Sequence, residues 1–88
     1  MDSRNVIGAF IIEDASDASI VKHHIQRTHK NEIYEYSCDE ISSKDSKIKY
    51  RFLFCNETLF TEINSFIKKM KIKIKKYNLK KLKKVSHV

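Results

Sequence analysis

The chain has 88 residues, of which 41% are hydrophobic and 33% charged, a balance typical of one small folded domain rather than of a disordered segment. It contains a single Gly and no Pro, which excludes a P-loop, a dinucleotide-binding fingerprint and collagen-like or Pro-rich designs. The formal net charge is +7, but residues 1–46 carry 9 Asp/Glu against 5 Lys/Arg, whereas residues 47–88 carry 2 against 13. This asymmetry predicts that one part of the surface meets an anionic partner.

The first predicted strand is the apolar run Val6–Ile12, whose length favours a strand buried on both faces. A helix is expected next, because Asp14–Asp17 supplies capping side chains. Val21 and Ile25 then recur at helical spacing, which predicts the face of this helix that packs on the core.

Two further strands are predicted at Glu32–Ile41 and Lys47–Cys55, which are rich in Tyr, Phe and Ile and flank a polar turn. Centring this hairpin on Ser43 aligns aromatic side chains on one face and opposite charges on the other. The predicted register pairs Tyr34 with Phe52, Tyr36 with Tyr50, Cys38 with Ile48, Glu35 with Arg51, and Asp39 with Lys47.

The last segment begins at Asn56, a predicted helix N-cap, and continues with apolar residues at helical spacing. We favour one helix over residues 57–84, because no Gly, Pro, Asn, Asp or Ser lies between Phe66 and Tyr77 to turn the chain. The competing interpretation is a strand near residues 70–76, where Lys and apolar residues alternate.

The predicted fold class is therefore α+β, with residues 1–88 forming a single domain. The favoured arrangement is β-α-β-β-α, a small antiparallel or mixed sheet of three strands with two helices on one face. A fourth strand near residues 70–76 would give the ferredoxin-like order β-α-β-β-α-β.

The strongest functional signal is a Lys-rich helix or tail at about residues 68–88. Lysine binds phosphate as a point charge, so this segment predicts non-specific, salt-sensitive contact with nucleic acid. The same segment also fits the groove of an acidic protein, and an anionic membrane surface is a less favoured partner. The predicted binding residues are Lys68, Lys69, Lys71, Lys73, Lys75, Lys76, Lys80, Lys81, Lys83 and Lys84.

A second predicted surface is apolar. If both helices cover one face of the sheet, the other face exposes a patch that marks a protein interface or an oligomer contact. The predicted interface residues are Ile7, Ile11, Ile33 and Leu53. Apolar residues in the last segment recur at alternating intervals of three and four residues. This spacing is typical of a coiled coil, so it also predicts a homodimer.

The histidines and cysteines of the chain do not form a recognisable catalytic or metal-binding motif. His23 and His24 are adjacent and Cys38 and Cys55 lack a C-x-x-C spacing, so we expect no metal, no cofactor and no small-molecule substrate. His24 falls on the apolar stripe, and His23 is expected to face solvent. A small nuclease needs a His or Glu for acid–base catalysis and a few cations to hold phosphate. These residue types are present, but no sequence motif places them at one site: Lys22, His23, His24, Arg27 and Glu35.

The stretch Lys49–Phe54 resembles the RNP1 motif of RNA-recognition domains, whose aromatic residues stack on bases. It lacks both small residues of that motif, and the predicted register turns its aromatic residues toward the helices. The opposite face is expected to carry cross-strand salt pairs instead.

No segment approaches the roughly 18–20 apolar residues that span a bilayer, and no region resembles a signal peptide. We therefore expect a cytoplasmic chain whose two cysteines are thiols. The preferred function is non-enzymatic, non-specific nucleic-acid binding by a dimer. The alternatives are a regulatory or inhibitory protein-binding module, of viral, phage or mobile-element origin, and a small nuclease or toxin.

Overall fold

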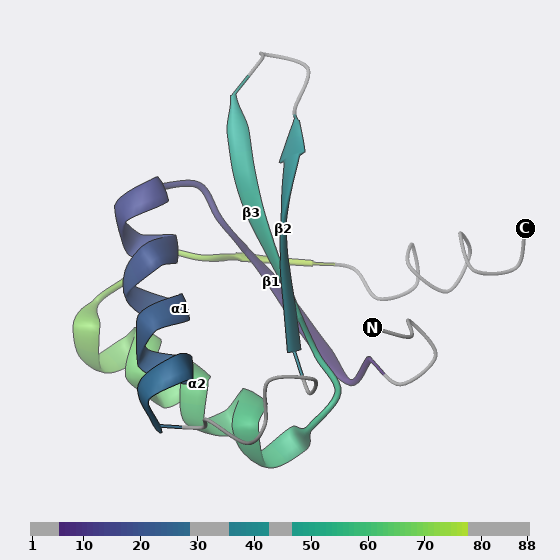
Figure 1. The fold of residues 1–88 in the computed structure, drawn as a ribbon, viewed down its shortest axis with the longest axis vertical. Helices are drawn as coiled ribbons and strands as arrows, with labels where there is room; N and C mark the ends of the chain where they lie inside the picture. Colours follow the sequence, from purple (N-terminus) through teal and green to yellow (C-terminus); the bar gives the residue numbers. More distant parts are fainter. Residues whose placement is uncertain (1–5, 29–35, 43–46, 78–88) are drawn as a thin grey trace, which may run out of the picture.

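Six elements follow one another in the computed structural model, which describes residues 6–28, 36–42 and 47–77. They are β1 (Gly8–Ile12), α1 (Ala15–Thr28), β2 (Tyr36–Ser42), β3 (Ile48–Phe54), α2 (Glu57–Met70) and β4 (Lys75–Lys76). The strands form one antiparallel sheet in the order β2-β3-β1-β4, and both helices lie on the same side of it (Figure 1). The α+β prediction is confirmed, and the fourth strand completes the ferredoxin-like order.

The inner face of the sheet, against the helices, is aromatic. Phe10 of β1 and Phe52 and Phe54 of β3 are at most 1% exposed, and the Phe10 and Phe52 rings stack with centroids 5.2 Å apart. Burial alternates along β1, so this strand is fully buried only on the inner face. The prediction that Val6–Ile12 is buried on both faces is therefore wrong. The aromatic residues of the RNP1-like stretch turn toward the helices, as expected, and offer no stacking surface on the other side.

The chain's one glycine lies where α2 crosses β1. A Cβ placed on Gly8 would overlap the ring of Phe60. The absence of a side chain at Gly8 therefore lets the helix approach the strand closely. Phe60 in turn packs beside Phe10 and Phe54, with ring centroids 6.4 and 5.3 Å away.

The first helix begins as its sequence predicts. Asp14 caps α1, with its carboxylate accepting a hydrogen bond from the Asp17 N–H at 3.1 Å. One face of the helix, formed by Ala18, Val21 and Ile25, is buried against the sheet.

The β2–β3 hairpin keeps the predicted faces but not the predicted register. Tyr36 pairs with Phe54 and Cys38 with Phe52, so β2 is displaced along β3 relative to the alignment centred on Ser43. The displacement is even, and an even shift leaves every side chain on its expected face. Both registers match aromatic with aromatic and acid with base, and the polar turn holds no Gly to fix one of them. The end of β2 and the start of β3 extend past the helices (Figure 1), and Ile48, the first residue of β3, is 52% exposed.

The predicted helix over residues 57–84 is wrong, because α2 ends at Met70. Asn56 caps its start as predicted, accepting a hydrogen bond from the Leu59 N–H at 2.9 Å. At its end Lys71 adopts a left-handed conformation with φ 59° and ψ 37°. The Lys71 N–H then donates to Lys68 O and the Ile72 N–H to Ile67 O, which is the Schellman arrangement that glycine usually supports. This turn sends the chain back to the sheet, where β4 pairs with β1.

None of the described helices is long and apolar enough to cross a membrane. The two cysteines, Cys38 and Cys55, form no disulfide, in agreement with the prediction of thiols.

Candidate nucleic-acid interface

The lysines of the predicted binding segment do not share one helix. Lys68 and Lys69 lie in the last turn of α2, Lys71 caps it, and Lys73 precedes the strand that contains Lys75 and Lys76. We call residues Lys68–Lys76 the basic run. All six of its lysines are exposed. The remaining predicted lysines, Lys80, Lys81, Lys83 and Lys84, lie outside the described residues.

The basic run lies along one end of α2 and one edge of the sheet, because β4 is the edge strand beside β1. Lys68 and Lys69 are placed favourably at the negative end of the helix dipole. Of the six lysines only Lys75 forms an ion pair with another described residue, at 3.4 Å from Glu13. The other five ammonium groups are therefore neutralised by no carboxylate in the part of the chain that the structure describes.

The open face of the sheet, opposite the helices, brings three charged residues together at its β4 side. Glu13 follows β1, and its Oε2 lies 3.4 Å from the Nζ of Lys49 on β3 and 3.4 Å from the Nζ of Lys75 on β4. The hydrogen bond from Lys49, aided by the charge of Lys75, holds the pKa of Glu13 below its usual 4.5. The sequence offered no signal for this triad, since its members are far apart in the chain.

A second charged cluster lies toward the middle of the open face. Arg51 donates from Nη2 to Asp39 Oδ2 at 2.6 Å and from Nη1 to the Tyr77 hydroxyl at 3.1 Å. Its guanidinium carbon lies 5.4 Å from the centroid of the Tyr77 ring, within cation–π range. The hydrogen bond to Asp39 raises the pKa of Arg51 above its usual value. The predicted cross-strand salt pairing on this face is thus present, but Arg51 meets Asp39 rather than Glu35, which lies outside the described residues.

The predicted apolar interface is only partly exposed. Leu53 is 7% exposed, so the expectation that it contributes to a surface patch is wrong. It lies on β3, a central strand, where its register partners are Ala9 of β1 and Ser37 of β2. Ile7 is 44% exposed and Ile11 is partly buried, while Ile33 lies outside the described residues.

The apolar stripe of α2 is packed inside the domain. Leu59, Ile63 and Ile67 are at most 3% exposed and belong to the hydrophobic core. Because these three residues are buried, their part of the apolar face is not available to a membrane surface or a coiled coil. The geometry of α2 therefore gives no support to either of those two expectations.

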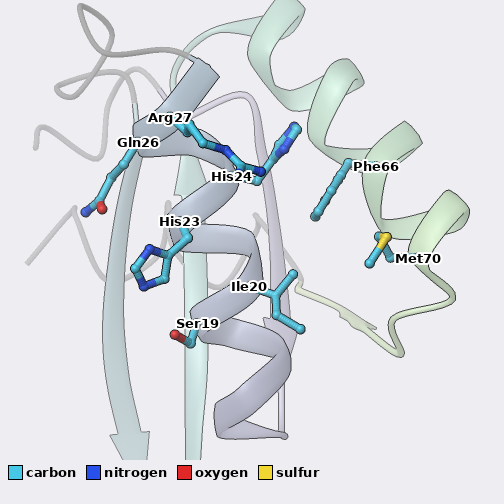
Figure 2. A pocket seen from close by; sticks show the side chains of 8 residues that line it. All are labelled: Ser19, Ile20, His23, His24, Gln26, Arg27, Phe66 and Met70. Carbon is cyan, nitrogen blue, oxygen red and sulfur yellow. The ribbon is translucent and has the colours of Figure 1, made fainter.

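A hollow of about 720 Å³ forms an open groove between the two helices (Figure 2). We call it the helix groove. Its apolar floor pairs Ile20 of α1 with Met70 of α2, which are 40% and 49% exposed, and Phe66 lies beside them. Arg27 contributes a cation to the rim. Sequence reasoning missed this groove, because its lining residues come from two helices that are far apart in the chain.

The two adjacent histidines point to different sides of α1. His24 stacks on Phe66, with ring centroids 3.8 Å apart, whereas His23 projects from the helix away from α2 (Figure 2). His24 is half-buried and His23 exposed, as predicted. The imidazoles therefore do not converge on one point, as acid–base partners on one substrate must. The described residues also contain no group of three or more His, Cys, Asp or Glu arranged to hold a metal ion.

Comparison of the chain with models of known protein families, with curated proteins and with solved structures found no match.

Proposed function

We propose that the chain binds nucleic acid without reading its sequence, through the basic run. The observation that supports this proposal is the gathering of six exposed lysines within nine residues, of which one alone is paired with a described carboxylate. Lysine ammonium groups contact phosphate oxygens as point charges and carry no base-specific geometry. The run borders both the end of α2 and the sheet edge at β4, and we propose that a phosphate backbone follows it from one to the other.

A fluorescence anisotropy titration tests this function directly. Labelled duplex DNA and duplex RNA should both bind, and six phosphate contacts predict that affinity falls about 10³-fold between 50 and 200 mM salt. Binding that is absent for both duplexes at 50 mM salt would refute the proposal.

A matched pair of variants locates the contact. Replacing Lys73 and Lys76 by Gln should reduce the slope of log K against log salt by about 1.8, since each duplex phosphate contributes about 0.9. The control replaces Lys22 and Arg27, two exposed cations of α1, and removes the same charge from another element. Equal losses from both double variants would show that net charge, and not the basic run, drives binding.

An alternative function is docking on an acidic partner protein, and the helix groove is the observation that favours it. A partner helix with an apolar face and an acidic face would place the first on Ile20 and Met70 and the second beside Arg27. The basic run extends from the Met70 end of this groove and adds further positive charge.

An amphipathic acidic helical peptide is a suitable probe for this alternative. Ile20→Asp should abolish its binding, because it places a charge on the floor of the groove and repels the acidic face. Ile7→Asp is the control, since Ile7 is similarly exposed at 44% but lies beside β1 rather than between the helices. Loss of binding in both variants, or in neither, would exclude the groove as the docking site.

A further inference from the structure

Two lysines from different strands converge on a single carboxylate oxygen of the open face. The Nζ atoms of Lys49 and Lys75 each lie 3.4 Å from Glu13 Oε2. The two ammonium groups outnumber the single negative charge between them. The two ammonium groups hold one carboxylate oxygen between them, and a phosphate oxygen can bind in the same place.

We infer that Glu13 occupies an anion site built by Lys49 and Lys75, and that a backbone phosphate of the bound nucleic acid displaces its carboxylate. The identity of the ligand rests on the proposed function. Glu13 then acts as an internal competitor, and it weakens binding at the end of the basic run nearest the sheet.

Differences in exposure support this exchange. The Lys49 side chain is 21% exposed, so its stem is held against the sheet and its ammonium group is positioned before a ligand arrives. The Glu13 side chain is 49% exposed and the Lys75 side chain 61%. The carboxylate can therefore rotate into solvent while Lys49 stays in place and Lys75 adjusts to the incoming group.

The location also links the site to the basic run. Lys75 belongs to the run and to β4, whereas Lys49 lies on β3, across β1 from it. A phosphate bound between them extends the contact from the sheet edge onto the open face. Two other carboxylates, Asp14 and Asp17, line the hollow beside Glu13 and Lys75, but neither forms an ion pair with a described lysine. Asp14 instead caps α1.

The test compares variants that lose one negative charge at different places. Glu13→Gln frees both lysines from half-exposed ion pairs, so affinity for labelled duplex DNA at 100 mM salt should rise about fivefold. Because the phosphate reaches both lysines in either complex, the slope of log K against log salt should change by less than about 0.9, the contribution of one contact. Glu40→Gln changes the net charge equally, but Glu40 is an exposed residue of β2, the opposite edge strand. Asp17→Asn removes a nearby charge that contacts neither lysine. Each control should change affinity less than threefold.

A second substitution tests the lysine that the ligand must reach. Lys49→Gln should lower affinity strongly in the Glu13→Gln background and only slightly in the unmodified chain, where Glu13 already competes for Lys49. Thermal unfolding of each variant, followed by circular dichroism, verifies that the fold is retained.

The outcomes separate this inference from the proposed function. Suppose that the unmodified chain binds duplex DNA and that Glu13→Gln changes affinity no more than Glu40→Gln does. The inference that phosphate displaces the Glu13 carboxylate is then refuted, while the proposed function stands. If the unmodified chain does not bind but Glu13→Gln does, phosphate does not displace the carboxylate, so both the inference and the proposed function are refuted. If neither binds, both are refuted.

Discussion

The two faces of the sheet are built from alternate residues of the same strands, yet they differ in almost every physical respect. On the inner face Phe10, Phe52 and Phe54 exclude water and stack against one another. On the open face Arg51 and Lys49, their neighbours along the chain, hold carboxylates in half-exposed ion pairs. Burial of apolar area dominates folding energetics, whereas exposed ion pairs contribute little. The comparison teaches that the inner face supplies the stability of this domain and the open face supplies charges that remain free to exchange partners.

The largest expected effect comes from the centre of the inner face. Phe52→Ala removes a ring that is 0% exposed and leaves a cavity between the sheet and the helices, so we expect a loss of about 3–5 kcal/mol in the free energy of unfolding. Urea denaturation followed by circular dichroism measures this loss. A decrease below about 1 kcal/mol would mean that the two faces contribute similarly and would break the comparison.

A smaller effect on the free energy of unfolding, of opposite sign, is expected at Lys71, in the turn between α2 and β4. Lys71 is held in the left-handed region, which costs a residue with a side chain roughly 1–2 kcal/mol, whereas Gly adopts it freely. Lys71→Gly should therefore stabilise the fold by up to about 1 kcal/mol, after the greater entropy of Gly in the unfolded chain is subtracted. Lys69→Gly is the control, because Lys69 lies inside α2 and Gly there should destabilise by about 1 kcal/mol. The same sign for both variants would contradict this account of the turn.

Lys71 also explains why the sequence predicted the start of α2 but not its end. Asn56 has a side chain that caps helices, so the start could be recognised from one residue. The end depends on a left-handed lysine, and it is stabilised by burial of Ile72, which follows the helix, beside Ile67. Helical periodicity cannot detect such an end, because the apolar spacing continues without a break into residues that pair with β1.

The open face shows a similar limit at longer range. Alternation within β3 correctly assigned Lys49 and Arg51 to one side of the sheet. Their actual partners depend on strand order and register, which placed Glu13 beside Lys49 and Asp39 opposite Arg51. Periodicity identifies the face on which a side chain lies. Pairing depends on contacts between distant segments, and these are decided by packing of the whole domain.

A still smaller effect is expected from the Arg51 cluster. Asp39→Asn removes the partner 2.6 Å from Arg51, but the two side chains are 47% and 23% exposed, so the loss should stay below about 1 kcal/mol. Because salt screens exposed charges, this loss should shrink further when urea denaturation is repeated in 1 M NaCl. A loss that is larger, or independent of salt, would show that Arg51 and Asp39 are a structural pair and would weaken the distinction between the faces.

The smallest effect on stability is expected at Glu13, and pH reveals its sign. The Lys49 hydrogen bond and the Lys75 charge place the folded-state pKa of Glu13 below the usual 4.5, so folding favours the ionised carboxylate. Its stabilising contribution is fully present above about pH 4.5 and is lost as pH falls through the lowered folded-state value. Urea denaturation of the unmodified chain and of Glu13→Gln should therefore give a small difference at pH 7 that disappears in a series toward pH 3. A difference that stays constant across this series would mean that Glu13 stabilises the fold by packing rather than by charge. Its carboxylate would then be harder to displace than the open face otherwise indicates.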